Sequence, residues 1–452
     1  MLVLAVAGLA ALAWTRVGEP QVAVEPTAPG IGRNALPVTV RAAEPSRGLA
    51  AIRLEVVQED RVTVLAERAY EEGPRPFWAF WGPRVTEDAM EVRVGLETVE
   101  GLEEGEATLR AVAERPGTPI RKGEAVSAEV SLPVRLRPPT VSVLSNQHYV
   151  AQGGSGVVVY RVGEDALAEG GTDGVRAGER FFPGHPLPGG GAGERFALFG
   201  VPWDLDDPQE VRLVATDAMA NRAEVEFLDR WFPEPPRNDT IRLSDEFLES
   251  VVPEILEQVP TLEDRGSLIA NYVQINSELR RENRRRLVET AADSRDEFLW
   301  REPFRPLPGG QVMSSFADRR TYVYEGEIVD RQTHLGYDLA TVRHDRVPAA
   351  NRGVVLLAEY LGIYGNVVVL DHGYGLMTLY AHLSSFAVEP GEVVERGQTL
   401  GRTGETGLAG GDHLHFTTLV GGMPVNPVEW WDERWIADRV APKLGDALPY
   451  GR

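Results

Sequence analysis

From residue 21 to residue 232 the sequence consists of short strand-like runs, alternating or apolar, and proline or glycine separates one run from the next. Residues 52–56 read Ile-Arg-Leu-Glu-Val, and residues 157–160 read Val-Val-Val-Tyr. A period of two is typical of strands that bury one face, and no helical period interrupts it between residues 21 and 137. This part of the chain is therefore restricted to β-sheet. We expect two β-sandwich modules of the immunoglobulin-like kind, over 21–137 and 138–232.

The period changes to that of a helix between residues 233 and 300. Leu248, Val252 and Ile255 then fall on one face. We expect a helical connector over 233–300, a C-terminal β domain over 301–440 and a tail over 441–452. The arginine-rich run at 280–286 is interpreted as a solvated helix face, with a contact to anionic lipid or to an acidic domain as the alternative.

The N-terminus suggests export. Residues 2–14 form an uncharged apolar run, which is shorter than the roughly 20 residues that a membrane-spanning helix needs. Residues 11–13 match the small-x-small pattern of a cleavage site, although the usual preceding positive charge is missing. We expect residues 1–20 to be a signal or membrane-anchor segment of a periplasmic or extracytoplasmic protein, with anchoring in the inner membrane as one alternative. The competing interpretation is a buried N-terminal strand or helix.

Composition limits the chemistry that the chain can perform. Lys and Arg number 46 against 68 Asp and Glu, so the formal net charge is −22. This charge would repel a phosphate backbone, and we expect no nucleic-acid partner. The chain has no cysteine, which excludes disulfides, thiolate metal sites and cysteine nucleophiles. A metal ion would have to be held by histidine and carboxylate.

Histidine is concentrated in one region, because six of the eight histidines lie between residues 334 and 415. Three phrases contain those of interest: Thr-His-Leu-Gly-Tyr-Asp at 333–338, Leu-Tyr-Ala-His-Leu at 379–383, and Gly-Asp-His-Leu-His-Phe at 411–416. His344 and His372 lie in a polar loop and in a hairpin phrase, and the chemistry does not need them.

The last phrase places two imidazoles at the spacing of a strand. His413 and His415 are two residues apart, so on a strand both would point to the same face and enter one cleft. His334, Asp338 and one histidine of this pair would surround a metal ion with three protein ligands. Such a set leaves a fourth tetrahedral position for water, which is typical of catalytic rather than structural zinc. His382 and the remaining histidine would then handle protons.

Further phrases stand in a fixed order around these histidines. They lie at residues 314–319, 334–338, 365–368, 372–373, 380–384, 393–398, 406–416 and 426–427. Together they closely resemble the LytM/lysostaphin-type zinc metallopeptidases, which hydrolyse peptide bridges or stems of bacterial peptidoglycan. The resemblance covers residues 310–432 and implies a compact, mainly antiparallel β-domain with the metal in an open groove.

The resemblance assigns a role to each candidate residue. His334, Asp338 and His415 correspond to the ligands of one zinc ion per chain, and His382 and His413 correspond to the pair beside it. Which of His382 and His413 is the base stays open. The sequence departs from the commonest family pattern at Asp412 and Thr417, where Pro and Glu are more usual, and this puts the substrate preference in doubt rather than the activity.

The expected function is therefore zinc-dependent endopeptidase action on peptidoglycan peptides. The main alternative is a catalytically silent activator of cell-wall hydrolases with the same fold. A biotinyl or lipoyl carrier is set aside, because such a carrier needs a lysine and residues 310–432 contain none. We expect the N-terminal segment to contact the membrane and the β modules to be available to an envelope regulatory protein. One hypothesis is that the helical connector covers the groove.

Overall fold

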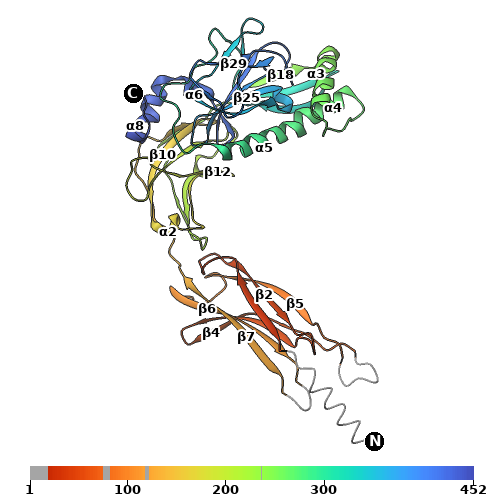
Figure 1. Ribbon diagram of the computed structural model, residues 1–452, viewed down its shortest axis with the longest axis vertical. Coiled ribbons are helices and arrows are strands. Elements are labelled where there is room, and N and C mark those ends of the chain that lie inside the picture. The colour runs from red at the N-terminus through yellow and green to blue at the C-terminus, as the bar shows by residue number, and fades with distance from the viewer. Residues whose placement is uncertain (1–18, 75–81, 118–121, 236, 452) are drawn as a thin grey trace, which may run out of the picture. The chain divides into compact units, whose positions relative to one another are not determined.

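The computed structural model describes residues 19–74, 82–117, 122–235 and 237–451 (Figure 1). The predicted signal or anchor run lies outside these residues, except for its last two positions. Within the described residues, no helix is both long and apolar enough to cross a membrane. The fold is mainly β with few helices, as the sequence predicted. The chain divides into two compact units, and the immunoglobulin-like arrangement of the modules stays a prediction.

The first unit comprises the described residues up to 140 together with 164–172 and 215–223. Its sheets follow the orders β1-β2-β5 and β4-β3-β6-β7. The elements are β1 (Gln21–Pro26), β2 (Leu36–Ala43), β3 (Ala51–Gln58), β4 (Arg61–Ala69), β5 (Glu87–Val94), β6 (Gly105–Arg115), β7 (Glu124–Val134) and α2 (Glu164–Leu167). Both sheets contribute to one core, in which Val40, Ile52 and Leu109 are fully buried. The predicted alternation of these strands accounts for this core.

The second unit holds the remaining described residues, including most of the predicted second module. In that module the sheet orders are β13-β14-β10-β8 and β12-β11-β15-β16, with β17 parallel to β9. The elements are β8 (Val141–Val143), β9 (Tyr149–Ala151), β10 (Ser155–Val162), β11 (Thr172–Ala177), β12 (Arg180–Pro183), β13 (His185–Pro186), β14 (Glu194–Gly200), η1 (Pro208–Glu210), β15 (Val211–Thr216), β16 (Arg222–Val225) and β17 (Arg230–Phe232). The boundaries at 137, 232, 300 and 440 stay predictions.

The C-terminal part is built on a large antiparallel sheet with the order β19-β22-β30-β26-β25-β24-β28, to which β31 adds beside β30. Its strands are β19 (Gln311–Ser314), β22 (Tyr337–Ala340), β24 (Gly353–Tyr360), β25 (Asn366–Asp371), β26 (Leu376–Ala381), β28 (Val393–Val394), β30 (Leu414–Val420) and β31 (Met423–Val425). Two small sheets flank it: β18 (Asn238–Arg242) with β20 (Asp318–Tyr324) and β21 (Glu327–His334), and β23 (Arg346–Pro348) with β29 (Thr399–Arg402) and β27 (Ser385–Phe386).

Helices cover both sides of this sheet. They are α3 (Asp245–Gln258), α4 (Leu268–Gln274), η2 (Ile275–Leu279), α5 (Arg280–Thr290), η3 (Ala291–Asp293), η4 (Gly362–Tyr364), α6 (Pro427–Trp431), α7 (Glu433–Arg439), α8 (Ala441–Leu444) and η5 (Gly445–Ala447). Ser244 and Ser267 cap α3 and α4 by accepting hydrogen bonds from backbone N–H groups. The segment predicted as a loose tail is helical and buries Leu444 and Leu448.

The register of the large sheet separates its two faces. Asp338 pairs with His415, and Ala381 pairs with His415 from the other side, so these side chains share one face. The intervening Tyr337 and Phe416 point to the opposite face, where both contact the ring of Trp431. The candidate site therefore lies on the face away from α6.

The segment predicted as a connector packs on the same face as the site. Val252 and Ile255 of α3, both fully buried, share one core with Leu379 and Ala381 of β26. Figure 1 shows α3, α4 and α5 beside the large sheet. These helices are thus a layer of the sheet's own core, and a chain that begins near Trp300 would lose that layer. The hypothesis that the segment covers the groove stays a prediction.

On the opposite face of the large sheet, α6 forms hydrogen bonds with the second module. The Glu429 carboxylate on α6 accepts hydrogen bonds from the backbone N–H and the hydroxyl of Ser155, at 2.8 and 3.0 Å, and Trp430 Nε1 donates to the same hydroxyl. Burial raises the pKa of Glu429 to about 8. Because Ser155 begins β10, this contact connects the module directly to the sheet.

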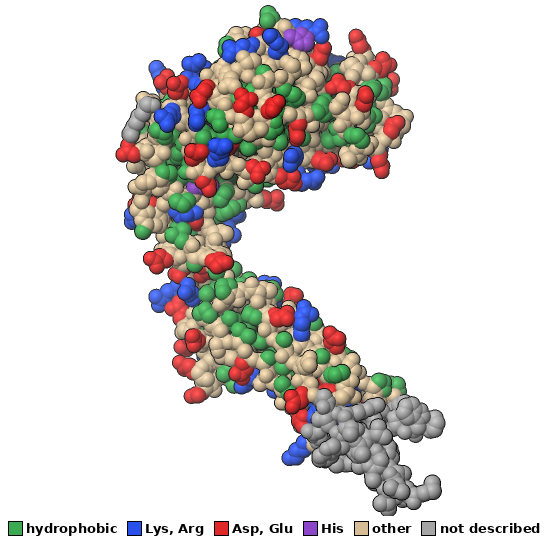
Figure 2. Space-filling model, in the orientation of Figure 1, with side chains coloured by type: hydrophobic (Ala, Val, Ile, Leu, Met, Phe, Trp, Pro, Cys, Tyr) green, Lys and Arg blue, Asp and Glu red, His purple; other side chains and the backbone are tan. Residues whose placement is uncertain are grey.

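The surface of the C-terminal part mixes charges of both signs. On the face that Figure 2 shows, carboxylates and basic groups are interspersed. Arg285 and Arg286, from the arginine-rich run on α5, are exposed and lie 3.9 Å from Glu289 and Glu359. Exposed pairs of this kind contribute little to stability. The run is only partly a solvated face, because Asn283 is buried and burial lowers the pKa of Arg284.

We expect Ile255→Ala to lower the free energy of unfolding by about 2–5 kcal/mol, because it leaves a cavity in the core that α3 shares with the large sheet. Urea unfolding followed by tryptophan fluorescence measures this change. The control is Glu257→Ala, an exposed change on the same helix that should alter stability by less than about 0.5 kcal/mol. A helical segment that unfolds in a separate, earlier transition would contradict the shared core.

Candidate metal centre

Three of the predicted residues meet at one point. His334 Nε2 lies 2.9 Å from Asp338 Oδ1 and 3.0 Å from His415 Nδ1, and His415 Nδ1 lies 2.9 Å from Asp338 Oδ1. The side chains are 5%, 13% and 9% exposed, respectively. Among the described residues, this is the group of histidine and carboxylate donors that fits a metal ion. The structure thus brings together one set of three that the sequence proposed, with His415 rather than His413 as the third member.

Strand pairing and one glycine bring these atoms together. Asp338 on β22 is directly opposite His415 on β30. His334 ends β21 in a different sheet, and the turn at Leu335 and Gly336 returns the chain to β22. A Cβ atom at Gly336 would lie 2.6 Å from the His415 ring and from Thr417 Oγ1, closer than atoms approach. Glycine is therefore required at this position of the turn.

Hydrogen bonds fix which nitrogen of each ring carries its proton. His334 Nδ1 lies 2.9 Å from the Ser315 carbonyl, which only accepts, so Nδ1 donates and Nε2 presents a lone pair. Thr417 donates its hydroxyl to the Leu335 carbonyl and lies 3.0 Å from His415 Nε2. Thr417 therefore accepts from Nε2, which leaves a lone pair on His415 Nδ1. The family departure at Thr417 thus supplies a tautomer-setting contact.

The centre consequently holds three acceptor atoms with no proton between them. Two imidazole lone pairs and a carboxylate oxygen repel one another at 2.9–3.0 Å, and a cation placed among them would remove the repulsion. Burial alone would raise the pKa of Asp338, but its contacts with His334, His413 and His415 hold that pKa well below its usual range. Burial lowers the pKa of His415 to about 4. Asp338 is therefore ionised and His415 neutral near neutral pH, which are the forms that metal binding needs.

Arg320 holds the second oxygen of the same carboxylate. Its Nη2 donates to Asp338 Oδ2 at 2.9 Å, while Oδ1 lies 2.9 Å from the nearest ring nitrogens of His334 and His415. Sequence reasoning missed this residue. The strand pattern could have indicated it. Asp318 on β20 pairs with His334 on β21. Arg320 is two residues after Asp318, so its side chain lies on the same face of β20 as that of Asp318.

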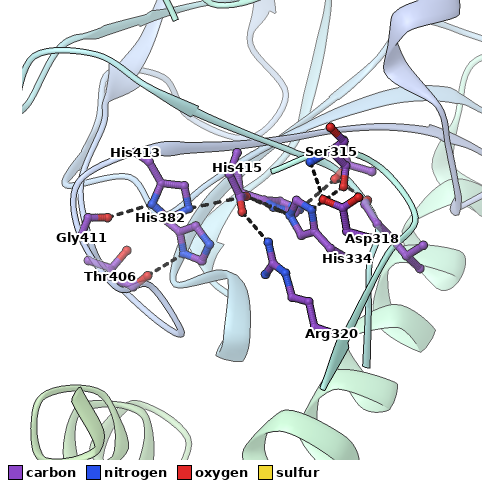
Figure 3. A network of polar contacts seen from close by, with 12 residues as sticks. Ser315, Asp318, Arg320, His334, His382, Thr406, Gly411, His413 and His415 are labelled. Carbon is purple, nitrogen blue, oxygen red and sulfur yellow. Dashed lines mark hydrogen bonds and ion pairs between the residues drawn. The ribbon is translucent and has the colours of Figure 1, made fainter. Parts of the chain in front are cut away.

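His382 and His413 lie side by side next to the three acceptors, with ring centroids 4.8 Å apart (Figure 3). His382 Nδ1 donates to the Thr406 carbonyl and His413 Nδ1 to the Gly411 carbonyl, both at 2.8 Å. In their neutral forms, both rings therefore present Nε2 as an acceptor. His413 Nε2 is 3.6 Å from Asp338 Oδ1.

The two rings differ in their electrostatic environment. Burial and the neighbouring histidines hold the pKa of His382 well below its usual value. Burial would lower the pKa of His413 too, but the hydrogen bond and negative charge of Asp338 outweigh it and raise that pKa. His382 also has a left-handed backbone with φ of 61°, which is uncommon for a residue other than glycine.

Neighbouring elements hold the loops that carry these rings. The Tyr364 carbonyl accepts from the His382 backbone N–H at 2.9 Å, and the Tyr364 ring lies 5.8 Å from the His415 ring. Glu254 of α3 accepts from the Gly407 N–H at 3.3 Å, next to the carbonyl that binds His382. Sequence reasoning missed Tyr364 and Glu254, since both contacts join segments distant in the chain.

The remaining two histidines of the cluster lie outside the centre. His372 is fully buried, and its ring nitrogens bond the Arg352 carbonyl and the Thr378 hydroxyl at 2.8 Å. His344 is exposed in a loop and contacts Ser384. The chemistry predicted for the centre does not need either residue.

Comparison with known proteins identifies the same region. Residues 332–427 match the family described as Peptidase family M23, which confirms the predicted LytM-type resemblance over this part of the chain. "DD-carboxypeptidase/endopeptidase Mpg" of Neisseria meningitidis is 42% identical over 95 residues, which are 21% of this chain and 22% of that protein. "Peptidoglycan DD-endopeptidase ShyA" of Vibrio cholerae is 36% identical over 119 residues, which are 26% of this chain and 27% of that protein.

A third relative is named as an activator rather than as a peptidase. "Murein hydrolase activator EnvC" of Escherichia coli is 40% identical over 123 residues, which are 27% of this chain and 29% of that protein. The chain therefore spans less than a third of the length of each of these curated relatives. A peptidase M23 structure from Pseudomonas aeruginosa is 20% identical, with a TM-score of 0.37, and covers 64% of this chain and 96% of that one.

We expect Gly336→Ala to displace the His415 ring and to weaken the binding of a divalent metal ion at least tenfold, because the added Cβ would overlap that ring. Competition with a chromophoric chelator measures the affinity. The control is Gly410→Ala, whose added Cβ would meet its nearest atom, on Phe247, only at 4.0 Å. Equal metal affinity of the two variants would show that the three acceptors are not the binding site.

Proposed function

We propose that this chain, whose residues 332–427 match Peptidase family M23, is a zinc-dependent endopeptidase that hydrolyses peptide cross-links or stem peptides of bacterial peptidoglycan. The observation that carries the proposal is the set of three converging lone pairs on His334, Asp338 and His415. Two imidazoles and one carboxylate with a free fourth position are the ligand set of catalytic zinc. One zinc ion per chain is proposed because the described residues offer one such set of three.

The residues of the centre fit the steps of amide hydrolysis. When bound, zinc would polarise the scissile carbonyl and lower the pKa of a water molecule to about 7. His382 and His413 both present Nε2 beside the ligand atoms, so one of them accepts the proton of the attacking water and returns it to the leaving amine. A positioned acid–base group of this kind contributes about 10²–10⁴ in rate. Which histidine is the base stays open.

The other histidine of the pair, when it is protonated on Nε2 as well, donates a hydrogen bond to the oxyanion as the carbonyl becomes tetrahedral. Loss of one such donor costs about 3–4 kcal/mol of transition-state stabilisation. His382 is held by the Thr406 carbonyl and His413 by the Gly411 carbonyl, so neither ring needs to reorient during the reaction. This pre-organisation is the contribution of the two loops.

The substrate class rests on the relatives. Two of them are named as peptidoglycan DD-endopeptidase and DD-carboxypeptidase/endopeptidase, and we transfer the peptide substrate to this chain on that basis. A peptidoglycan substrate implies a place in the cell envelope. Export by the N-terminal segment, a periplasmic location, anchoring in the inner membrane and a regulatory partner on the β modules remain predictions.

The second candidate function is a catalytically silent activator of cell-wall hydrolases. The relative named as a murein hydrolase activator supports it. A regulator does not need three unprotonated acceptors in one buried place. The intact donor set, with a second histidine pair beside it, favours the enzyme.

We expect purified wild type to contain one zinc ion per chain and to release dye from labelled peptidoglycan. His415→Ala removes one of three ligands, so it should lose the metal and reduce hydrolysis at least about 10²-fold. Elemental analysis and the dye-release assay measure the two effects. His344→Ala, which changes an exposed histidine outside the centre, is the control. Wild type that stays metal-free and inactive after zinc is supplied would leave the activator.

We expect His382→Ala and His413→Ala to behave differently from the ligand variant. Each should retain zinc at the wild-type ratio and lose about 10²–10⁴ in kcat, because the missing ring handles protons or the oxyanion. Elemental analysis and steady-state kinetics on a soluble cross-linked peptide measure this. Variants that lose the metal along with the activity would place these histidines among the ligands instead.

A further inference from the structure

We propose that Arg320 binds a carboxylate of the substrate, and that the enzyme selects peptides with a free carboxylate on the carbon atom next to the scissile nitrogen. This inference rests on the proposed function and specifies its substrate class. Arg320 extends from β20 toward the histidines of the centre (Figure 3). Its side chain is 18% exposed, so it is partly accessible from the site.

The charges at the centre require another anion. Asp338 shares one negative charge between Arg320 on one oxygen and the metal position on the other. With zinc bound, the ion (+2), the Asp338 carboxylate (−1) and the Arg320 guanidinium (+1) together would carry a net charge of +2. In a partly buried site, this excess positive charge is poorly screened, so a substrate anion placed there is strongly favoured.

The hydrogen bonds of Arg320 also leave donors free. Its Nη2 donates to Asp338 Oδ2, and Tyr322 also interacts with this side chain. Nε has no hydrogen-bond partner among the residues that the structure describes, but it is buried, so a substrate carboxylate would meet the outer nitrogens of the guanidinium. A buried donor left unpaired costs free energy. The guanidinium is a planar fork that matches the geometry of a carboxylate, which makes arginine better suited than lysine to this contact.

The position of Arg320 indicates where the substrate carboxylate would lie. Asp338 contacts both Arg320 and the metal position, so the guanidinium is one carboxylate away from the reacting atoms. On the amine side of the peptide, a group on the carbon atom that follows the scissile nitrogen is the nearest to the reacting atoms, so we place the substrate carboxylate there. A cross-link whose amine side bears a free carboxylate presents such a group, and a bridge of glycine residues does not.

The name of one relative agrees with recognition of a substrate carboxylate. The Neisseria protein is named as a carboxypeptidase as well as an endopeptidase. Every carboxypeptidase substrate carries a free carboxylate on the residue that follows the scissile amide. The competing explanation is that Arg320 only orients Asp338 for the metal, in which case it acts as a positioning residue.

The test uses a synthetic cross-linked stem peptide in two versions, with a carboxylate or a carboxamide on the carbon next to the scissile nitrogen. We expect zinc-loaded wild type to hydrolyse the carboxylate version with a kcat/KM at least tenfold higher. Arg320→Gln should reduce this ratio to about one, and Arg320→Lys should keep part of it. Arg319→Gln is the matched control, because Arg319 is the neighbouring arginine on the opposite face of β20, where it lies over Trp203.

Each result has a distinct meaning. Equal hydrolysis of the two versions by wild type would overturn the carboxylate contact while leaving the proposed function intact. A variant that weakens zinc binding in chelator competition and slows both versions equally would make Arg320 a positioning residue only. No hydrolysis of either version by zinc-loaded wild type would contradict the proposed function itself.

Discussion

The centre depends on a repulsion that the fold has to overcome. Three acceptor atoms face one another at 2.9–3.0 Å, and hydrogen bonds to the Ser315 carbonyl and the Thr417 hydroxyl keep both ring protons on the far side. Free side chains would avoid this arrangement. It persists because Asp338 and His415 are register partners in one sheet and because Gly336 admits the His415 ring. The unfavourable contact is therefore held in place by the backbone, and a bound cation makes it favourable.

A backbone that holds such a contact has to be rigid, and the packing on both faces of the large sheet provides this rigidity. On the face of the site, α3 buries Val252 and Ile255 against β26. On the other face, the Glu429 contact with Ser155 connects α6 to the second β module. The centre lies on the first of these faces, where Asp338 of β22 is opposite His415 of β30. The helical segment thus supports the site through the core and through Glu254, whose carboxylate holds the loop that orients His382.

Much of this site could be predicted from the sequence, because strand alternation places His413 and His415 on one side and the family phrases single out His334, Asp338 and His382. Alternation alone left open which histidine of the pair lies beside His334 and Asp338, and register places His415 there, since His415 and not His413 is paired with Asp338. The packing role of residues 245–290 was not predictable, because an amphipathic helix does not reveal which sheet covers its apolar face. The sequence linked the departure at Thr417 to substrate preference, and only the tertiary contacts with Leu335 and His415 show what its hydroxyl does.

Asp338 connects the two kinds of chemistry in the centre. Its two oxygens are divided between partners, with Oδ1 facing His334 and His415 and Oδ2 facing Arg320, so the carboxylate has one oxygen for a metal ion. A carboxylate divided in this way neutralises neither partner fully. The same arrangement that fixes the ligand therefore leaves positive charge beside the reacting atoms, and this charge favours an anionic group on the substrate. Metal binding and substrate choice would then depend on one side chain rather than on separate parts of the site.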